Sequence, residues 1–358
     1  MTISSFMNKQ VNIPYLLKIG NGKTHKIGKY LNDKHLKKIV IFWSEGIKDM
    51  LYPELQPGLE EYQIKLLNEQ EVRFINIEEI TKIAFSLPRE TEVILGIGGG
   101  KALDFAKYCA HLREVPFISV PSSTSNNSFC SPYASLIVNG QRKIVKASIP
   151  FGVVVDLDVI YQSPKIFLYS GVGDMVSKIT ALYDWKQAYE QGLEQYNDFA
   201  SLLSYNSLTL LFNKHSTDIT DRSFQRSLVN SLLSSGIAME IAGSSRPTTG
   251  AEHLISLALD NIARRPRLHG LQIGVTSYLC ALLQRNPSFI YVRDILAVTG
   301  FFSYMKEDPL SKEDFVKALQ LAPTLKTDYY TILSETDSFA RALQFLDKDP
   351  ILNQLVRY

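Results

Sequence analysis

Short β-branched runs alternate with a helical stretch through the first 160 residues of this sequence. Candidate strands cover residues 37–43, 92–97, 115–121 and 152–160. Between the second and third of these lies the stretch 101–112, whose apolar positions recur at helical spacing. Strands that alternate with helices are typical of a parallel sheet covered by helices on both faces. We therefore predict that the N-terminal half is an α/β domain.

The pattern changes near residue 165, after which long helical stripes replace the strand-like runs. The clearest stripes cover residues 174–191, 227–243, 250–263 and 271–284. At 358 residues the chain exceeds the size at which a single core stops growing, so two domains are expected. We predict an α/β domain over residues 1–163 and a helical domain over residues 164–358. A small-molecule site is expected in the cleft between them.

Composition and charge exclude several classes of partner. The formal net charge of +2 gives no argument for nucleic acid, and no stretch reaches the roughly 18 apolar residues of a membrane helix. Cys109, Cys130 and Cys280 are too few and too widely spaced for a disulfide framework. The first 20 residues also lack the apolar core of a signal peptide. We expect a cytoplasmic homo-oligomer that acts on a small molecule and contacts neither nucleic acid nor membrane.

A glycine cluster follows the second candidate strand and directly precedes the predicted helix. In the run GIGGG, Gly98, Gly99 and Gly100 let the backbone turn sharply and approach a ligand closely. A helix that begins after such a run presents free N–H groups and the positive end of its dipole, which suits a phosphate. The spacing differs from both the G-x-G-x-x-G fingerprint and the P-loop, so a tight structural turn remains the alternative.

A second loop, residues 121–135, follows the third candidate strand. Its sequence PSSTSNNSFCSPYAS is rich in hydroxyls and amides, and it lies where parallel-sheet proteins bind ligands. A polar surface loop with capping serines is the alternative interpretation. The position beside the glycine cluster favours a shared ligand site.

Two histidines lie beside predicted helices, His253 in GAEHLIS and His269 in RLHGLQIGV. Their separation is too long for one helix face, so we expect each on a different helix, with Asp174 of SGVGDMVSK at the start of a third. Two imidazoles and a carboxylate leave open positions on a divalent metal such as Zn²⁺ or Fe²⁺, where a substrate oxygen can bind. Three isolated residues also match such a pattern by chance, so core or capping roles remain the alternative.

Five segments in this order resemble one known family. They are GIGGGKALDFAK, FISVPSSTS, GVGDMVSKITALYDW, GAEHLIS and RLHGLQIGV, and the resemblance runs from about residue 12 to about residue 300. Together they resemble the glycerol-1-phosphate dehydrogenase branch of the iron-containing alcohol dehydrogenase and dehydroquinate synthase-like superfamily. The resemblance implies a Rossmann-like N-terminal domain, a helical C-terminal domain and an active site in the cleft. It also implies NAD or NADP as cofactor and one divalent metal, zinc or iron.

The same resemblance implies roles for individual residues. The family's metal ligands fall on Asp174, His253 and His269. Its pyrophosphate loop falls on Gly98, Gly99 and Gly100, with Asp104 completing a GGG-x-x-x-D pattern, and its nicotinamide side falls on Thr124, Ser131 and Tyr133.

Three positions depart from the family pattern. Asn127 stands where relatives commonly carry an Asp near the substrate, and a neutral amide there can direct an N–H toward an anion. Leu257 replaces a histidine that is frequent in close relatives. Ser44 stands where NAD-specific relatives often carry an Asp for the ribose 2′-OH, although the adjacent Glu45 can substitute. The choice between NAD and NADP therefore stays open.

These features predict a dehydrogenase that interconverts a small polyol or polyol phosphate with its ketone. The leading pairs are glycerol 1-phosphate with dihydroxyacetone phosphate and glycerol with dihydroxyacetone. Lys178, one helical turn after Asp174, either reaches a substrate phosphate or pairs with that carboxylate. Two other functions stay open: a dehydroquinate synthase-like cyclase that uses NAD transiently, and a cofactor-binding protein without activity.

Overall fold

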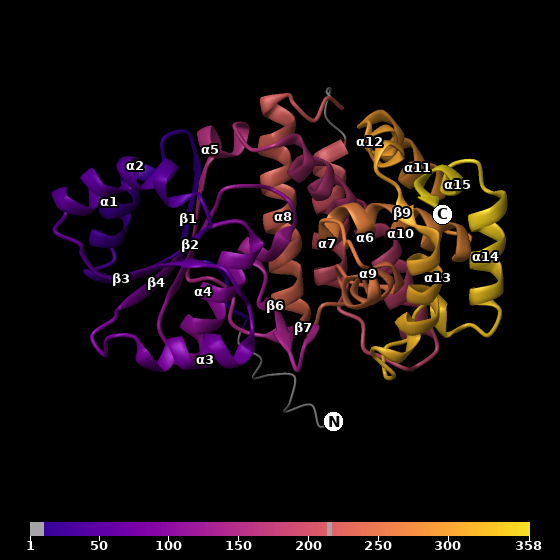
Figure 1. The fold of residues 1–358 in the computed structure, drawn as a ribbon, viewed down its shortest axis with the longest axis horizontal. Helices are drawn as coiled ribbons and strands as arrows, with labels where there is room; N and C mark the ends of the chain where they lie inside the picture. Colours follow the sequence, from indigo (N-terminus) through magenta and orange to yellow (C-terminus); the bar gives the residue numbers. More distant parts are fainter. Residues whose placement is uncertain (1–10, 213–216) are drawn as a thin grey trace.

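The computed structural model describes residues 11–212 and 217–358, and it shows a sheet-containing half beside a helical half (Figure 1). Part of the segment used to argue against a signal peptide, residues 1–10, lies outside the described residues. The main sheet has six parallel strands in the order β1-β8-β5-β4-β2-β3. They are β1 (Leu16–Gly20), β2 (Lys38–Ser44), β3 (Lys65–Val72), β4 (Val93–Gly98), β5 (Phe117–Pro121) and β8 (Gly152–Asp156).

Helices cover both faces of the sheet because successive residues of its central strands point in opposite directions. Ile39 and Ile41 of β2 pack with α1 (Ile27–Asn32) and α2 (Lys48–Glu61). Val40 and Phe42 pack on the other face with α3 (Ile77–Ser86) and α4 (Gly100–Arg113). A strand buried on both faces reads as one continuous apolar run, as IVIFW does.

The helical half extends from α6 to the C-terminus (Figure 1). Its helices are α6 (Lys165–Glu190), α7 (Asp198–Phe212), α8 (Arg222–Ala242), α9 (Ala251–Ile262), α10 (His269–Leu283), α11 (Phe289–Val298), α12 (Phe301–Glu307), α13 (Lys312–Leu321), α14 (Ser338–Lys348) and α15 (Leu352–Leu355). A short pair, β9 (Leu310–Ser311) with β10 (Val356–Arg357), interrupts the helices. Val153 and Val155 of β8 belong to the same core as these helices, so the two halves are packed together. Along the described ranges, no helix has the length and apolarity needed to cross a membrane.

The structure corrects the prediction of a strand over residues 152–160. Strand β8 ends at Asp156, whose side chain accepts a hydrogen bond from the Asp158 N–H and so caps α5 (Leu157–Tyr161). The predicted domain boundary at residue 163 falls between α5 and α6, and it stays a prediction. An antiparallel hairpin of β6 (Tyr133–Val138) and β7 (Gln141–Lys146), which we did not predict, follows the polar loop. The sequence feature that indicates this hairpin is the turn Asn139-Gly140, where both residues have positive φ.

The prediction that Asp174 begins a helix is wrong, because α6 already begins at Lys165. The glycines before Asp174 are points of close packing: a Cβ on Gly173 would lie 2.0 Å from the carbonyl oxygen of Gly270 in α10, and one on Gly171 would lie 2.1 Å from that of Thr124. Glycine therefore lets α6 approach α10 and the polar loop closely.

Candidate active site

Asp174, His253 and His269 come together from three helices, α6, α9 and α10. One ligand atom from each lies within 4.8 Å of the others. The His253 Nε2 atom is 3.8 Å from Asp174 Oδ1, and the two imidazole centroids are 5.2 Å apart. Asp174 is buried, so a carboxylate and two imidazoles face one another away from bulk water. This arrangement is the donor set that a zinc or iron ion takes in proteins.

Both imidazoles are held through their Nδ1 atoms. His253 Nδ1 lies 2.8 Å from Glu252 Oε1, and His269 Nδ1 lies 3.4 Å from Ser256 Oγ. These contacts leave the Nε2 atom of each ring as the nitrogen available to a ligand. Burial lowers the pKa of both imidazoles, so the neutral rings that a metal requires are favoured at neutral pH. The donor set therefore fits a divalent metal.

Glu252 is a site residue that our sequence analysis missed, although it stands next to His253 in GAEHLIS. It is fully buried, and its carboxylate accepts hydrogen bonds from the Gly250 N–H (2.7 Å) and the Thr180 hydroxyl (2.9 Å). Burial raises the pKa of Glu252 to about 7. The carboxylate fixes the orientation of the His253 ring, which is the usual task of a partner behind a metal-binding histidine.

Lys178 pairs with Asp174 within α6. Its Nζ donates to the Asp174 carbonyl oxygen (2.6 Å) and lies 3.2 Å from Oδ2, and its side chain is only 1% exposed. Of the two roles considered for Lys178, the structure brings it to the carboxylate. Its positive charge compensates the buried negative charge of Asp174.

The glycine loop lies against the end of β2. Gly98 has φ +137°, and a Cβ there would lie 2.2 Å from Ser44 Oγ, so only glycine fits. The Gly99 N–H donates to Ser44 Oγ at 2.9 Å, and α4 begins at Gly100. Because Ser44 engages the Gly99 N–H, the free N–H groups at the start of α4 are the ones available to a phosphate. Gly98, Gly99 and Ser44 thus form one structural unit.

Asp104 makes its contacts inside the protein. Lys107 Nζ lies 3.1 Å from one carboxylate oxygen, and the Ser135 N–H donates to the other at 3.0 Å. The same Lys107 donates to the carbonyl oxygens of Ser128 (2.7 Å) and Tyr133 (2.6 Å). The pair of Asp104 and Lys107 therefore joins α4 to the polar loop and β6. A contact of Asp104 with the cofactor stays a prediction.

The predicted nicotinamide residues lie in or beside the polar loop. Thr124 is buried, and within the described residues its hydroxyl has no hydrogen-bond partner. An orphaned hydroxyl of this kind suits a ligand that donates or accepts a hydrogen bond there. Ser131 Oγ accepts from the Tyr133 N–H at 3.0 Å, which shapes the exit of the loop into β6. Burial raises the pKa of the Tyr133 phenol.

One serine that sequence reasoning missed connects the polar loop to the histidine pair. Ser170 Oγ donates to the carbonyl oxygen of Ser125 (2.9 Å) and accepts from the Gly270 N–H (3.1 Å). Gly270 directly follows His269, and Ser170 lies one turn before Asp174. The polar loop and the candidate metal ligands are therefore held in one small region. No pattern in the sequence distinguishes Ser170 from other serines.

Asn127 faces helix α8. Its Nδ2 atom donates to Ser235 Oγ at 3.2 Å and lies 3.6 Å from Met239 Sδ. We had considered that this N–H points to an anionic substrate, and the structure instead engages it with the helical half. A role for Asn127 toward the substrate stays a prediction. Leu257 is half-buried on α9.

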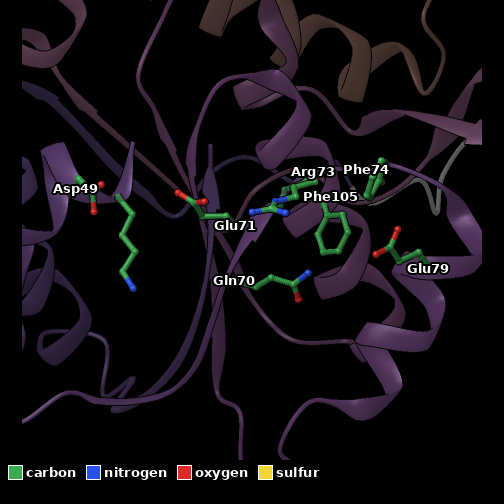
Figure 2. A pocket seen from close by; sticks show the side chains of 9 residues that line it. Asp49, Gln70, Glu71, Arg73, Phe74, Glu79 and Phe105 are labelled. Carbon is green, nitrogen blue, oxygen red and sulfur yellow. The ribbon is translucent and has the colours of Figure 1, made fainter. Parts of the chain in front are cut away.

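An open pocket of about 580 Å³ lies beside Ser44, at the ends of β2 and β3 (Figure 2). Val72, which pairs with Ser44 in the sheet, is one of its lining residues. The others are Lys48, Asp49, Gln70, Glu71, Arg73, Phe74, Glu79 and Phe105. The Glu45 Oε1 atom lies 3.9 Å from Arg73 Nε. A cation therefore lies beside the carboxylate that could take the place of the Asp found in NAD-specific relatives.

Comparisons with known proteins agree with this fold. The model of the iron-containing alcohol dehydrogenases matches residues 18–164. A glycerol-1-phosphate dehydrogenase (NAD(P)+) from Metallosphaera sedula is 32% identical over 333 residues, covering 91% of this chain and 93% of that protein. This chain belongs to the glycerol-1-phosphate dehydrogenase family. A member from Methanosarcina acetivorans is 34% identical over 337 residues, covering 93% of this chain and 94% of that protein.

Solved structures show that this glycerol-1-phosphate dehydrogenase family member shares the fold of a wider group. The glycerol dehydrogenase of Schizosaccharomyces pombe superposes with a TM-score of 0.72, covering 97% of this chain and 91% of that chain. At 19% identity this likeness shows the fold alone. The predicted family and the two-part fold, a Rossmann-like domain followed by a helical domain, are thereby confirmed.

Proposed function

We propose that this chain is a metal-dependent, NAD(P)-linked dehydrogenase that interconverts glycerol 1-phosphate and dihydroxyacetone phosphate. The observation that carries the proposal is the convergence of Asp174, His253 and His269 within 4.8 Å of one another. Relatives named for glycerol 1-phosphate and NAD(P)+ match more than nine-tenths of the chain, which supports this substrate and cofactor. We also expect a homo-oligomer, which size-exclusion chromatography would test.

Asp174, His253 and His269 would hold the metal. When bound, a divalent ion supplies Lewis-acid polarisation of the substrate's carbonyl oxygen. The protein's own contribution is positional: Glu252 fixes the ring of His253, and Lys178 compensates the charge of Asp174. The buried surroundings exclude water and strengthen electrostatic interactions in the site.

The cofactor's pyrophosphate would lie at the start of α4, where N–H groups and the helix dipole favour an anion. Its adenosine end would occupy the pocket beside Ser44 (Figure 2), and its nicotinamide would face the polar loop near Thr124. When bound, NAD(P)H supplies the hydride, so the residues named here orient the cofactor and substrate.

The proposal predicts a specific outcome in a substrate panel. Purified, metal-loaded protein should oxidise NADH or NADPH with dihydroxyacetone phosphate, and reduce the cofactor with glycerol 1-phosphate, as followed by nicotinamide absorbance. Turnover of dihydroxyacetone alone would identify a glycerol dehydrogenase. Phosphate release without net cofactor oxidation would indicate a cyclase. Cofactor binding without turnover of any substrate would indicate a non-catalytic protein.

Ser44→Asp should change the cofactor preference. Ser44 lies under the glycine loop and offers no charge against a 2′-phosphate, so we expect the wild-type protein to use NADPH. A carboxylate there would repel that phosphate and accept from a free 2′-OH. We expect kcat/KM for NADPH to fall about tenfold or more relative to NADH. Ser44→Asn, which adds a similar volume without charge, is the control. An equal change of kcat/KM for both cofactors in Ser44→Asp would show that Ser44 does not face the ribose.

A further inference from the structure

Three cations contact the helices that carry the candidate metal ligands or the segment next to them. They are Lys178 in α6, Arg142, which pairs with Asp260 of α9, and Lys326, which is joined through Tyr329 to the start of α9. The first two are neutralised by the protein, since Lys178 pairs with Asp174 (3.2 Å) and Arg142 with Asp260 (3.3 Å). Within residues 11–212 and 217–358, Lys326 has no carboxylate at ion-pair distance. Of these three cations, Lys326 is therefore the one that no carboxylate of the described residues neutralises.

Aromatic packing holds Lys326 near the start of α9. Its Nζ lies 4.4 Å from the centroid of the Tyr329 ring. The Tyr329 hydroxyl donates to the carbonyl oxygen of Thr249 at 2.6 Å. Thr249 immediately precedes Gly250, the N-cap of helix α9, and His253 is the third residue of that helix. The ring thus anchors the lysine to the start of the helix that carries His253.

A second cation on the same ring, Arg246, engages a carboxylate of its own. The guanidinium of Arg246 lies 3.4 Å from the Tyr329 centroid and is buried. Its Nε atom donates to Glu194 Oε2 at 2.6 Å, and its Nη2 atom donates to the other oxygen of the same carboxylate. Its Nη1 atom donates to the carbonyl oxygen of Tyr330 at 2.8 Å. With Glu194 engaged by Arg246, the cluster retains one net positive charge. A partly buried cation without a counter-ion is unfavourable until an anion arrives.

We propose that the Lys326 ammonium binds the phosphate group of the substrate. The inference rests on the proposed function. In dihydroxyacetone phosphate the phosphate ester is carried on the carbon next to the carbonyl, so its anchor must lie close to the metal ligands. Lysine is a suitable anchor because its compact charge pairs well with phosphate oxygens. Lys326 would thereby distinguish the phosphorylated ketone from dihydroxyacetone, whose hydroxyl carries no charge.

The test compares the two ketones in Lys326→Met. We expect KM for dihydroxyacetone phosphate to rise about ten- to hundredfold, the usual loss for a hydrogen bond to a charged group, with KM for dihydroxyacetone unchanged. Lys326→Arg should keep most of the discrimination, because it keeps the charge. Lys312→Met is the matched control: it removes the same charge from the helical half, at a surface pair with Asp347 (2.7 Å). Thermal melting and metal content verify that each variant is folded.

Two results would overturn the inference while leaving the proposed function intact: an unchanged KM for the phosphate, or an equal rise for both ketones. If the wild-type protein turns over only the neutral ketone, the proposed function itself fails. The inference is then decided by calorimetry with inorganic phosphate, whose binding Lys326→Met must weaken at least tenfold. Equal phosphate binding by wild type and Lys326→Met would contradict it.

Discussion

Replacing His269 with alanine should abolish both bound metal and activity. His269 supplies one of three ligand atoms that lie within 4.8 Å of one another, and alanine leaves only Asp174 and His253. Because a metal contributes several kcal/mol to stabilising a developing alkoxide, we expect kcat to fall on the order of a thousandfold or more. Metal content by mass spectrometry and initial rates with dihydroxyacetone phosphate are the measurements.

The exposed His25 provides the control for this experiment. His25→Ala removes an exposed imidazole of the α/β half that does not belong to the three-residue cluster, and it should keep both metal and activity. The fold of His269→Ala should persist, because the one hydrogen bond of its ring to the part of the chain that the structure describes is the long contact with Ser256 (3.4 Å). A His269→Ala protein with one metal per chain would show that the ligand assignment is wrong.

Replacing Gly99 with valine should weaken cofactor binding on the order of a hundredfold while the protein stays folded. Gly99 has φ −83° and ψ 176°, which any residue adopts, and among the described residues a Cβ there meets only Ser44 Oγ, at 3.9 Å. A branched side chain is thus tolerated by the protein but projects from the loop that a pyrophosphate must approach. Fluorescence titration with NADH and NADPH measures the effect.

The neighbouring Gly98 separates a binding defect from a folding defect. Gly98→Ala combines φ +137° with a Cβ only 2.2 Å from Ser44 Oγ, so it should lower the melting temperature. Gly99→Val should not. If folded Gly99→Val binds cofactor as tightly as wild type, the glycine loop is a structural turn and not a phosphate cradle.

Local patterns in the sequence were enough to predict the order of the domains and the elements around the site. The runs IVIFW and VILGIG are buried on both faces, and continuous apolar character of this kind indicates a central parallel strand. Strands β1 and β3 were missed because they lie at the edges of the sheet, where half-exposed side chains carry no clear period. The family motifs also named the three metal-ligand candidates.

Partners distant in sequence could not be predicted, because a hydrogen bond depends on where two elements meet in space. Ser170 connects Ser125 to Gly270, and Lys107 connects α4 to the polar loop. Asn127 illustrates the reverse case: its chemistry suggested an anion contact, whereas the packing of α8 engages its N–H with Ser235.

The sequence by itself determined the two-part fold, the glycine loop and the identity of Asp174, His253 and His269, because each is recorded in a local pattern or motif. Only the tertiary structure decided which charges are neutralised. Lys178 and Arg142 each have a carboxylate partner, whereas Lys326 has none among the described residues. The distinction arises because the pairing of charges depends on distances between elements that the chain brings together only when it folds.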